Sequence, residues 1–327
     1  MLGNSTIEYP QPSGLRVTLA THNHWQVYQQ DHVIFSGILI SPTKFQLNRE
    51  HLQGALLLPV CHAIFSTIST LECISLEAGN PLVNTDYMQR TSDGEYLLFK
   101  SMLWQLGELW LAQPESKPFP HMQVLDSAGY HPLRANPLTG DLYHRYIPEL
   151  KSWIKLRTLD IDRDLALFNR WQNDERVAAF WEQKGTLGEH RDYLQTQLND
   201  PKNQIIIASF DDQPFAYFEV YWSKEDRIAP YYAAGDYDRG IHMLVGEDKH
   251  RGPHKVSAWL SSLCHYIYLS DPRTLRIVSE PRADNEKMIN YLQQQHFSKQ
   301  KEFSFSHKRA ALMLQFRDSF FTQFKYT

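Results

Sequence analysis

The chain has 327 residues with a formal net charge of −4, and 42% of them are hydrophobic, 13% aromatic and 21% charged. That composition is typical of a globular protein with ample apolar material for a core, and the mild charge argues against nucleic acid or a membrane surface as a partner. No apolar run reaches the ~20 residues of a membrane span, and the N-terminus lacks a signal-peptide pattern. Three cysteines without paired spacing (Cys61, Cys73 and Cys264) do not indicate a disulfide framework. We therefore expect a cytoplasmic protein.

The first part of the chain has strand and helix patterns but no chemical motif. The stretches LRVTLA (15–20) and VIFSGILI (33–40) have strand character, whereas residues 54–68 and 95–111 have the length and periodicity of helices. Five prolines then fall between Pro114 and Pro137, a density that resists both helix and central strand. We read this stretch as a long connection and predict an N-terminal domain over residues 1–140 and a second domain over residues 141–327.

The second part of the chain alternates strand and helix patterns. A strand is expected over residues 153–160, followed by a helix over 162–171 with Asp162 as its N-cap. The order of the elements predicts an α/β fold, a mixed sheet with helices on both faces. The remaining expected elements are a helix over 188–198, strands over 203–210 and 214–222 joined by a hairpin at DDQ, a strand over 239–246, a helix over 255–269, a strand over 274–280, a helix over 285–297, and strands over 301–305 and 309–316.

A basic loop with one glycine joins the predicted strand over 239–246 to the helix that follows it. Three cationic side chains, Lys249, Arg251 and Lys255, flank Gly252, which lets the backbone approach a ligand closely. Pro253 suits the first turn of a helix, and the free N–H groups of a helix N-terminus bind phosphate readily. The loop is neither a Walker motif nor a dinucleotide fingerprint. It indicates a pyrophosphate cradle, with a solvated basic loop as the alternative.

Several motifs in the second domain resemble one enzyme family. The strand–loop–helix, together with EPRADNEKMINYLQQQHF, resembles the core of the GNAT acetyltransferases, in which this loop holds the pyrophosphate of acetyl-coenzyme A. The usual loop pattern, aligned on Arg251, expects small residues where His254 and Val256 stand. The resemblance is tighter to the siderophore-biosynthesis acyltransferases, above all the aerobactin-type N6-hydroxylysine acetyltransferases. It is carried over roughly residues 145–320 by FNRWQNDERVAAFWEQKGT, PFAYFEVYW, KEDRIAPYY, DYDRGIHMLVGEDKHRGPH, DPRTLRIVSEPRADNEKM and HKRAALM.

The resemblance implies a GNAT fold, an N-terminal domain that is a degenerate second copy of it, and acetyl-coenzyme A as co-substrate without a metal. The implied reaction moves the acetyl group to the hydroxylated side-chain amine of N6-hydroxylysine, giving a hydroxamate. His22 and His24 have no further ligand at a zinc-like spacing. The residues expected to bind the coenzyme are Leu244, Gly246, Lys249, Arg251, Gly252, Pro253, Lys255 and Asn285.

Two residues are candidates for catalysis. His242 lies on the predicted strand over 239–246, and the resemblance implies that it is the general base beside the acceptor nitrogen. A histidine packed within a sheet is the structural alternative. Asp284 follows a strand at the carboxyl end of the sheet. The resemblance implies that an aspartate at this position either pairs with the histidine or binds the hydroxylamine. Its alternative is a helix N-cap, which Asn285 can also supply.

Aromatic and acidic residues are expected on the acceptor side. Trp181 and Trp222 would pack the aliphatic chain of lysine, and Glu182 and Glu219 would meet its α-ammonium group. For the tryptophans, burial in the core is the alternative.

Two other functions stay open. One is acetyl or succinyl transfer to N-hydroxycadaverine or N-hydroxyputrescine, and the other is a non-catalytic module that binds acyl-coenzyme A. The partners expected are a small hydroxylamine substrate and other enzymes of siderophore biosynthesis.

Overall fold

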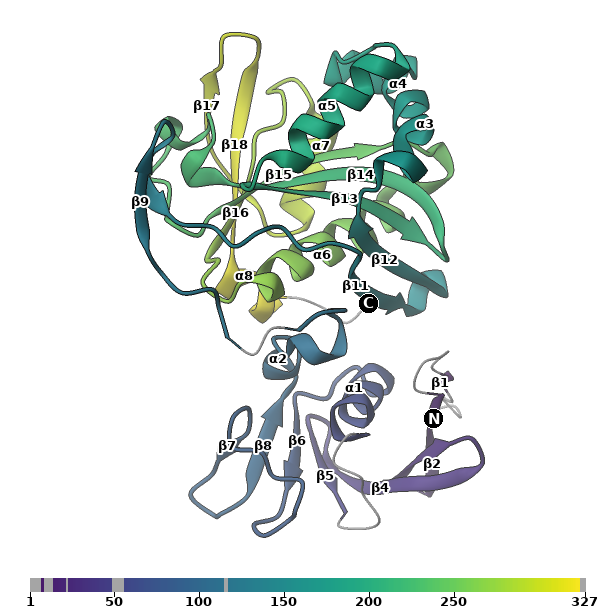
Figure 1. The fold of residues 1–327 in the computed structure, drawn as a ribbon. Helices are drawn as coiled ribbons and strands as arrows, with labels where there is room; N and C mark the ends of the chain where they lie inside the picture. The colour runs from purple at the N-terminus through teal and green to yellow at the C-terminus, as the bar shows by residue number, and fades with distance from the viewer. Residues whose placement is uncertain (1–6, 9–13, 22, 49–55, 115–116, 324–327) are drawn as a thin grey trace. The chain divides into compact units, whose positions relative to one another are not determined.

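Two eight-stranded sheets organise the chain, one in each of two compact units (Figure 1). The first unit ends at Leu109 and the second begins at Trp110, earlier than the predicted boundary after residue 140. The proline-rich connection therefore belongs to the second unit, where it forms a small hairpin of β9 (Gln123–Asp126) and β10 (Gly129–Pro132). The computed structural model describes residues 7–8, 14–21, 23–48, 56–114 and 117–323.

The sheet of the second unit has the strand order β11-β12-β13-β14-β15-β16-β18-β17, in which every neighbouring pair is antiparallel except β15 and β16. Its strands are β11 (Asp141–Ile147), β12 (Ser152–Thr158), β13 (Asn203–Phe210), β14 (Gln213–Trp222), β15 (Arg239–Val245), β16 (Arg276–Ser279), β17 (Ser298–Ser304) and β18 (Arg309–Phe316). Its helices are α3 (Ile161–Gln172), α4 (Glu175–Trp181), α5 (Leu187–Asn199), α6 (Pro253–Ser270), α7 (Glu286–Gln294) and α8 (Arg317–Gln323). The predicted mixed sheet is confirmed.

The parallel pair diverges after a short contact. Only Arg239 with Ile277 and Gly240 with Val278 are in register, and β15 then continues to Val245 without a ladder partner in β16. Strands that separate leave backbone N–H and C=O groups without a ladder partner at the carboxyl ends of both strands. This opening between β15 and β16 is where His242, one of the two predicted catalytic residues, lies.

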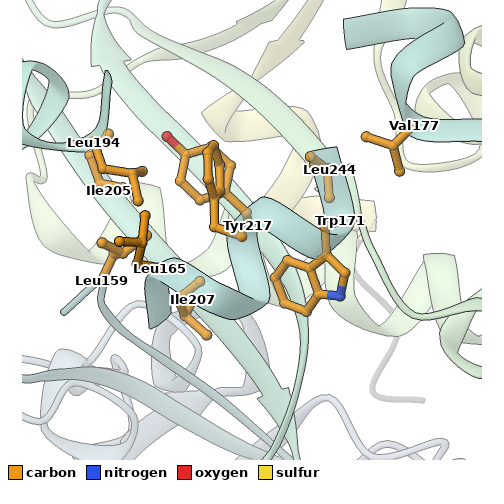
Figure 2. Close-up of a cluster of buried hydrophobic side chains, with 10 residues drawn as sticks. Leu159, Leu165, Trp171, Val177, Leu194, Ile205, Ile207, Tyr217 and Leu244 are labelled. Carbon is orange, nitrogen blue, oxygen red and sulfur yellow. The ribbon is translucent and has the colours of Figure 1, made fainter. Parts of the chain in front are cut away.

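One face of the sheet is covered by α3, α4 and α5. Their apolar residues, including Leu165, Trp171 and Leu194, pack on Ile205, Ile207, Tyr217 and Leu244 of the strands (Figure 2). Each such side chain contributes roughly 1.5–3 kcal/mol when it is fully buried. The cluster therefore holds the three helices on the strands that carry the site.

The other face of the sheet is covered by α6. Trp259 of this helix is fully buried, with its ring 5.4 Å from the ring of Phe218 on β14. All three cysteines are free thiols, and Cys264 of α6 is buried. No helix in the described ranges is both long enough and apolar enough to cross a membrane.

Helix ends correct two details of the sequence interpretation. The side chain of Asp160, and not that of Asp162, caps α3 by accepting the backbone N–H groups of Asp162 and Arg163. A separate helix, α4, is capped by Asp174 and precedes α5, which begins with a capping box of Thr186 and Glu189. The short α4 was not predicted because its apolar period is only two turns long.

The first unit repeats the topology of the second. Its strand order is β1-β2-β3-β4-β5-β6-β8-β7, and the parallel pair, β5 and β6, stands at the same position as β15 and β16. In both units a helix, α1 or α6, connects the parallel strands. Among the residues that the structure describes, no counterpart of α3–α5 or α7 is present. The elements are β1 (Ile7–Glu8), β2 (Leu15–Thr21), β3 (His24–Gln29), β4 (His32–Ser41), β5 (Lys44–Leu47), α1 (Leu57–Thr67), β6 (Cys73–Leu76), β7 (Gln89–Arg90), β8 (Tyr96–Phe99) and α2 (Lys100–Leu103).

The helix expected over residues 95–111 is wrong. Residues Tyr96–Phe99 form β8, paired with β6, and only the single turn of α2 follows. Pairing with a neighbouring strand outweighs the local helical pattern, because sheet contacts depend on tertiary context.

Candidate active site

His242 lies in the opening between β15 and β16, held between two carboxylates. Its Nδ1 is 2.8 Å from Oε2 of Glu219, the residue opposite it on β14, and its Nε2 is 2.7 Å from Oε1 of Glu280, which directly follows β16. A carboxylate accepts hydrogen bonds when ionised, so both ring nitrogens donate and the imidazole is a cation. The side chain remains 25% exposed, so a ligand in the opening can reach it.

Neighbouring hydroxyl groups and one lysine hold the two carboxylates in place. Oε1 of Glu219 accepts from the hydroxyl groups of Tyr193 and Tyr217. Oε2 of Glu280 accepts from Tyr221 at 3.0 Å, and its backbone oxygen accepts from Lys308 Nζ at 2.8 Å. Every carboxylate oxygen of the cluster therefore has a donor, as a buried charged network requires.

A glycine makes room for this network. A Cβ at Gly240 would lie 2.0 Å from the ring of Tyr221, its partner in the register of β14 and β15. Because Gly240 has no side chain, the Tyr221 ring lies flat on β15 and its hydroxyl reaches Glu280.

The charges of the cluster shift its pKa values. Burial alone would lower the pKa of His242, but the negative charges and hydrogen bonds of Glu280 and Glu219 outweigh it and raise the pKa to about 10. Burial opposes ionisation of Glu280, yet the His242 cation holds its pKa at about 2. The pKa of Glu219 is also lowered, by His242 and the two tyrosine hydroxyls against the effect of burial. At neutral pH all three groups are therefore ionised, and His242 is not a neutral base at rest.

The structure brings only some of the predicted acceptor residues to His242. The Trp181 ring is 6.4 Å from the imidazole, at the end of α4. Glu219 is beside His242 but is buried with both oxygens engaged, so it is not free for an ammonium group. Trp222 lies on the opposite face of the sheet, because it pairs with Arg239 and side chains alternate along a strand.

Asp284 does not pair with His242. Its two oxygens accept from Arg282, each at 3.1 Å, and these hydrogen bonds lower the pKa of the exposed Asp284 carboxyl. Glu182, exposed at the end of α4, lies 3.5 Å from the same arginine. The N-cap of α7 is Asn285, whose side chain accepts from the N–H of Met288 at 3.2 Å. Asp284 and Glu182 thus form an exposed group of ion pairs with Arg282.

The loop after β15 has the features of an anion cradle. Gly252 is the N-cap of α6 with φ of 104°, a conformation that favours glycine, and Pro253 occupies the first turn. Space around Gly252 is open, since a Cβ there would meet nothing within 4 Å. Lys249 and Arg251 are held at the loop by Gln213 and Asp248, at 2.6 and 3.2 Å.

Other residues expected to bind the coenzyme have structural roles. The Leu244 side chain is in the core, and Gly246 packs under the Trp171 ring. The carbonyls of Val245 and Gly246 accept from Arg176 at 2.9 and 3.1 Å. Lys255 lies 4.8 Å above the Phe210 ring.

Sequence reasoning missed Glu280 and the tyrosines that hold the cluster. Glu280 begins the EP pair in a quoted motif, directly after β16, the strand that pairs in parallel with the first residues of β15. An acidic residue at that position was a usable signal. The three tyrosines (Tyr193, Tyr217 and Tyr221) had no such signal in the sequence, because a tyrosine on a buried face is usually an ordinary core residue. Of the two histidines considered as metal ligands, His22 lies outside the described residues and His24 begins β3.

Comparison with known proteins identifies relatives. A family model described as acetyltransferase (GNAT) domain matches residues 160–305. A putative lysine N-acyltransferase of Schizosaccharomyces pombe is 40% identical over 263 residues, covering 79% of this chain and 78% of that protein. The N(6)-hydroxylysine O-acetyltransferase of Escherichia coli is 40% identical over 229 residues, covering 69% of this chain and 72% of that protein.

A fungal relative and one solved structure extend the comparison. The N(5)-hydroxyornithine:cis-anhydromevalonyl coenzyme A-N(5)-transacylase of Beauveria bassiana is 43% identical over 218 residues, 62% of this chain and 48% of that protein. The crystal structure of an uncharacterized protein from Bacillus halodurans superposes with a TM-score of 0.52 at 26% identity, covering 63% of this chain and 95% of that one.

Proposed function

Because this chain belongs to the GNAT acyltransferase family, in the siderophore-biosynthesis group that its motifs resemble, we propose that it acetylates the hydroxylated side-chain amine of N6-hydroxylysine. Acyl transfer to N-hydroxylated amines is the activity that the names of the Escherichia coli and Beauveria bassiana relatives share. The observation that carries the proposal is the imidazolium of His242, clamped by Glu219 and Glu280 in the opening between two diverging parallel strands.

Acetyl-coenzyme A is the acyl donor of GNAT acetyltransferases. The residues fit such a ligand, since Gly252 leaves open space at the N-terminus of α6 and Lys249 and Arg251 flank it with positive charge. The unpaired edge of β15 beyond Gly240 offers backbone groups to the amides of the pantetheine arm. The thioester then supplies the acyl carbon beside His242.

The protonated state of His242 sets the order of proton transfers. A hydroxylamine nitrogen is weakly basic and largely neutral near pH 7, so it can attack the thioester carbon directly. When the C–N bond has formed and the C–S bond breaks, one ring N–H of the imidazolium leaves its carboxylate and gives its proton to the leaving thiolate. The neutral imidazole then takes the proton from the acylated nitrogen, and the cation is restored. His242 therefore acts first as an acid and then as a base, in place of the resting base expected from the sequence.

The test is thiol release from acetyl-coenzyme A by the full chain. N6-hydroxylysine is compared with lysine, N-hydroxycadaverine and N-hydroxyputrescine, and acetyl- with succinyl-coenzyme A. The expected result is turnover with acetyl-coenzyme A and N6-hydroxylysine that exceeds the other pairs, and a product that forms a coloured iron(III) complex. Only N-acylation gives such a hydroxamate, so a product without iron(III) colour would mean O-acylation. Binding of acetyl-coenzyme A without thiol release under any condition would favour a non-catalytic module.

A further inference from the structure

A cavity lies on the opposite face of the sheet from His242. Its volume is about 170 Å³, and it is lined by the chain that precedes β11, the C-terminal end of α6 and the ends of β13–β15. Most of its wall is apolar, with Leu138, Leu269 and Pro272 among the lining side chains. Arg239 and Trp222 line it from the sheet, where they face each other in the register of β14 and β15.

Arg239 is a buried cation without a carboxylate of its own. The residue is 7% exposed, and its guanidinium lies 4.0 Å from the centre of the Trp222 ring. One nitrogen donates to the backbone oxygen of Val220 at 3.4 Å, while Nε has no hydrogen-bond partner among the residues that the structure describes. Within the same described ranges, no ion pair to Arg239 is formed.

The neighbouring arginines differ from Arg239 in this respect. Arg134 lies on the Trp222 ring as well, at 4.3 Å, but it binds both oxygens of Glu225 at 2.5 and 2.7 Å. Arg273 binds both oxygens of Asp271 at 2.9 and 2.6 Å. The acidic groups nearest the cavity are therefore already neutralised, and Arg239 contributes an excess positive charge to an apolar wall.

A buried unpaired charge is costly unless a partner compensates it. Burial lowers the pKa of Arg239 to about 10, so the guanidinium is still charged at neutral pH. The buried Tyr266 lines the same cavity. An oxyanion in the cavity would accept from the guanidinium of Arg239.

We propose that this cavity is a binding site for a small organic carboxylate, separate from the acyl-transfer site. The planar fork of a guanidinium matches the two oxygens of a carboxylate. The apolar wall of Leu138, Leu269 and Pro272 suits a short carbon chain better than it suits a fully hydrated phosphate. At ~30 Å³ for each water-sized group, the cavity holds roughly six non-hydrogen atoms, which is the size of butyrate.

The experiment measures butyrate binding to the full chain by calorimetry and by ligand-observed NMR. Arg239→Gln removes the charge and keeps the length of a polar side chain. Ala135→Phe fills the rim of the cavity and leaves Arg239 in place. Arg191→Gln, at an exposed arginine on α5, is the matched control for loss of one positive charge.

The expected result is saturable binding of butyrate to the parent chain, weakened at least tenfold in Arg239→Gln and Ala135→Phe and unchanged in Arg191→Gln. Butyramide, the uncharged analogue, should not compete. Phosphate should bind more weakly than butyrate. The proposal is overturned if the parent chain does not bind butyrate, if both cavity variants bind it as the parent does, or if phosphate binds more tightly. If Arg239→Gln fails to fold, Ala135→Phe alone decides the outcome.

Discussion

The protonation state of His242 follows from the two residues that contact it. Sequence reasoning located the histidine, and the resemblance assigned it the role of general base. Its charge, however, depends on Glu219 and Glu280, which are 23 and 38 residues away along the chain. Alternation along β14 and β15 places Glu219 on the same face, whereas Glu280 arrives only because β16 pairs with β15 in parallel. The local alternation of side chains therefore predicts in part that Glu219 lies beside His242, but it gives no sign that Glu280 does.

The rate of acetyl transfer should report the acid role of His242. The raised pKa of about 10 means that the imidazolium persists through neutral pH and is lost only as the pH rises through that value. We therefore expect the turnover number to fall above about pH 10 and to show no step near 6.5, the pKa of an ordinary histidine. The measurement is the pH dependence of thiol release. A step near 6.5 would mean that a neutral imidazole starts the reaction.

Removing the Glu280 carboxylate should shift the fall in turnover to lower pH. Glu280→Gln takes away the largest charge that favours the imidazolium, so the pKa of His242 should drop by roughly one to three units. NMR titration of the imidazole measures the shift directly. Tyr221→Phe is the matched control, because it removes one hydrogen bond to Glu280 and leaves the charge. Its expected shift is much smaller, and equal shifts would contradict the assignment of the effect to charge.

At the level of elements, the structure decides how helices begin and how the basic loop at Gly252 is shaped. The interpretation of Asp162 as the cap of α3 was reasonable, since aspartates stand at both 160 and 162. Only the backbone geometry separates them, and Asp160 has the extended conformation of a cap. The loop at Gly252 was predicted from composition, and its positive φ gives the physical reason for the glycine.

The cap assignment can be tested by stability. Asp160→Ala should lower the free energy of unfolding by about 1 kcal/mol, because two backbone N–H groups of α3 lose their acceptor. Asp162→Ala, the matched control inside the first turn, should cost less, since its exposed carboxylate adds only a charge near the helix N-terminus and an exposed ion pair with Arg191. Urea unfolding followed by circular dichroism measures both. A larger loss for Asp162→Ala would reverse the assignment.

The glycine of the loop can be tested by kinetics. Gly252→Ala places a Cβ on a residue with φ of 104°, which strains the backbone even though the space around it is open. We expect the KM for acetyl-coenzyme A to rise by about tenfold with little change in the KM for the hydroxylamine, as a loop that positions one substrate requires. Gly188→Ala, in the first turn of α5, is the control and should change neither KM.

For the whole molecule, the charged cluster makes stability depend on pH. The raised pKa of His242 stabilises the fold fully below about 6.5, and this stabilisation is lost as the pH rises toward 10. The lowered pKa of Glu280 acts in the other direction. Its stabilisation is present above about 4.5 and is lost as the pH falls toward 2. The cluster therefore favours the folded state most between these ranges.

Urea unfolding between pH 6.5 and 9.5 tests this dependence. The parent chain should lose stability over that interval, whereas His242→Gln should lose less because no imidazolium remains to be discharged. His24→Gln, at an exposed histidine of the first unit, is the control and should follow the parent. A slope that survives in His242→Gln would assign the dependence to other groups.

The sequence by itself determined the type of most strands and helices in the second unit, the position of the basic loop at Gly252 and the family, because these depend on local periodicity and on short motifs. The tertiary structure alone decided the ion pairs of His242, the placement of Trp222 on the far face, and the cavity beside Arg239. Each of these depends on which strands pair and in which register. That choice joins residues distant along the chain, and a shift of one residue would turn every side chain to the other face.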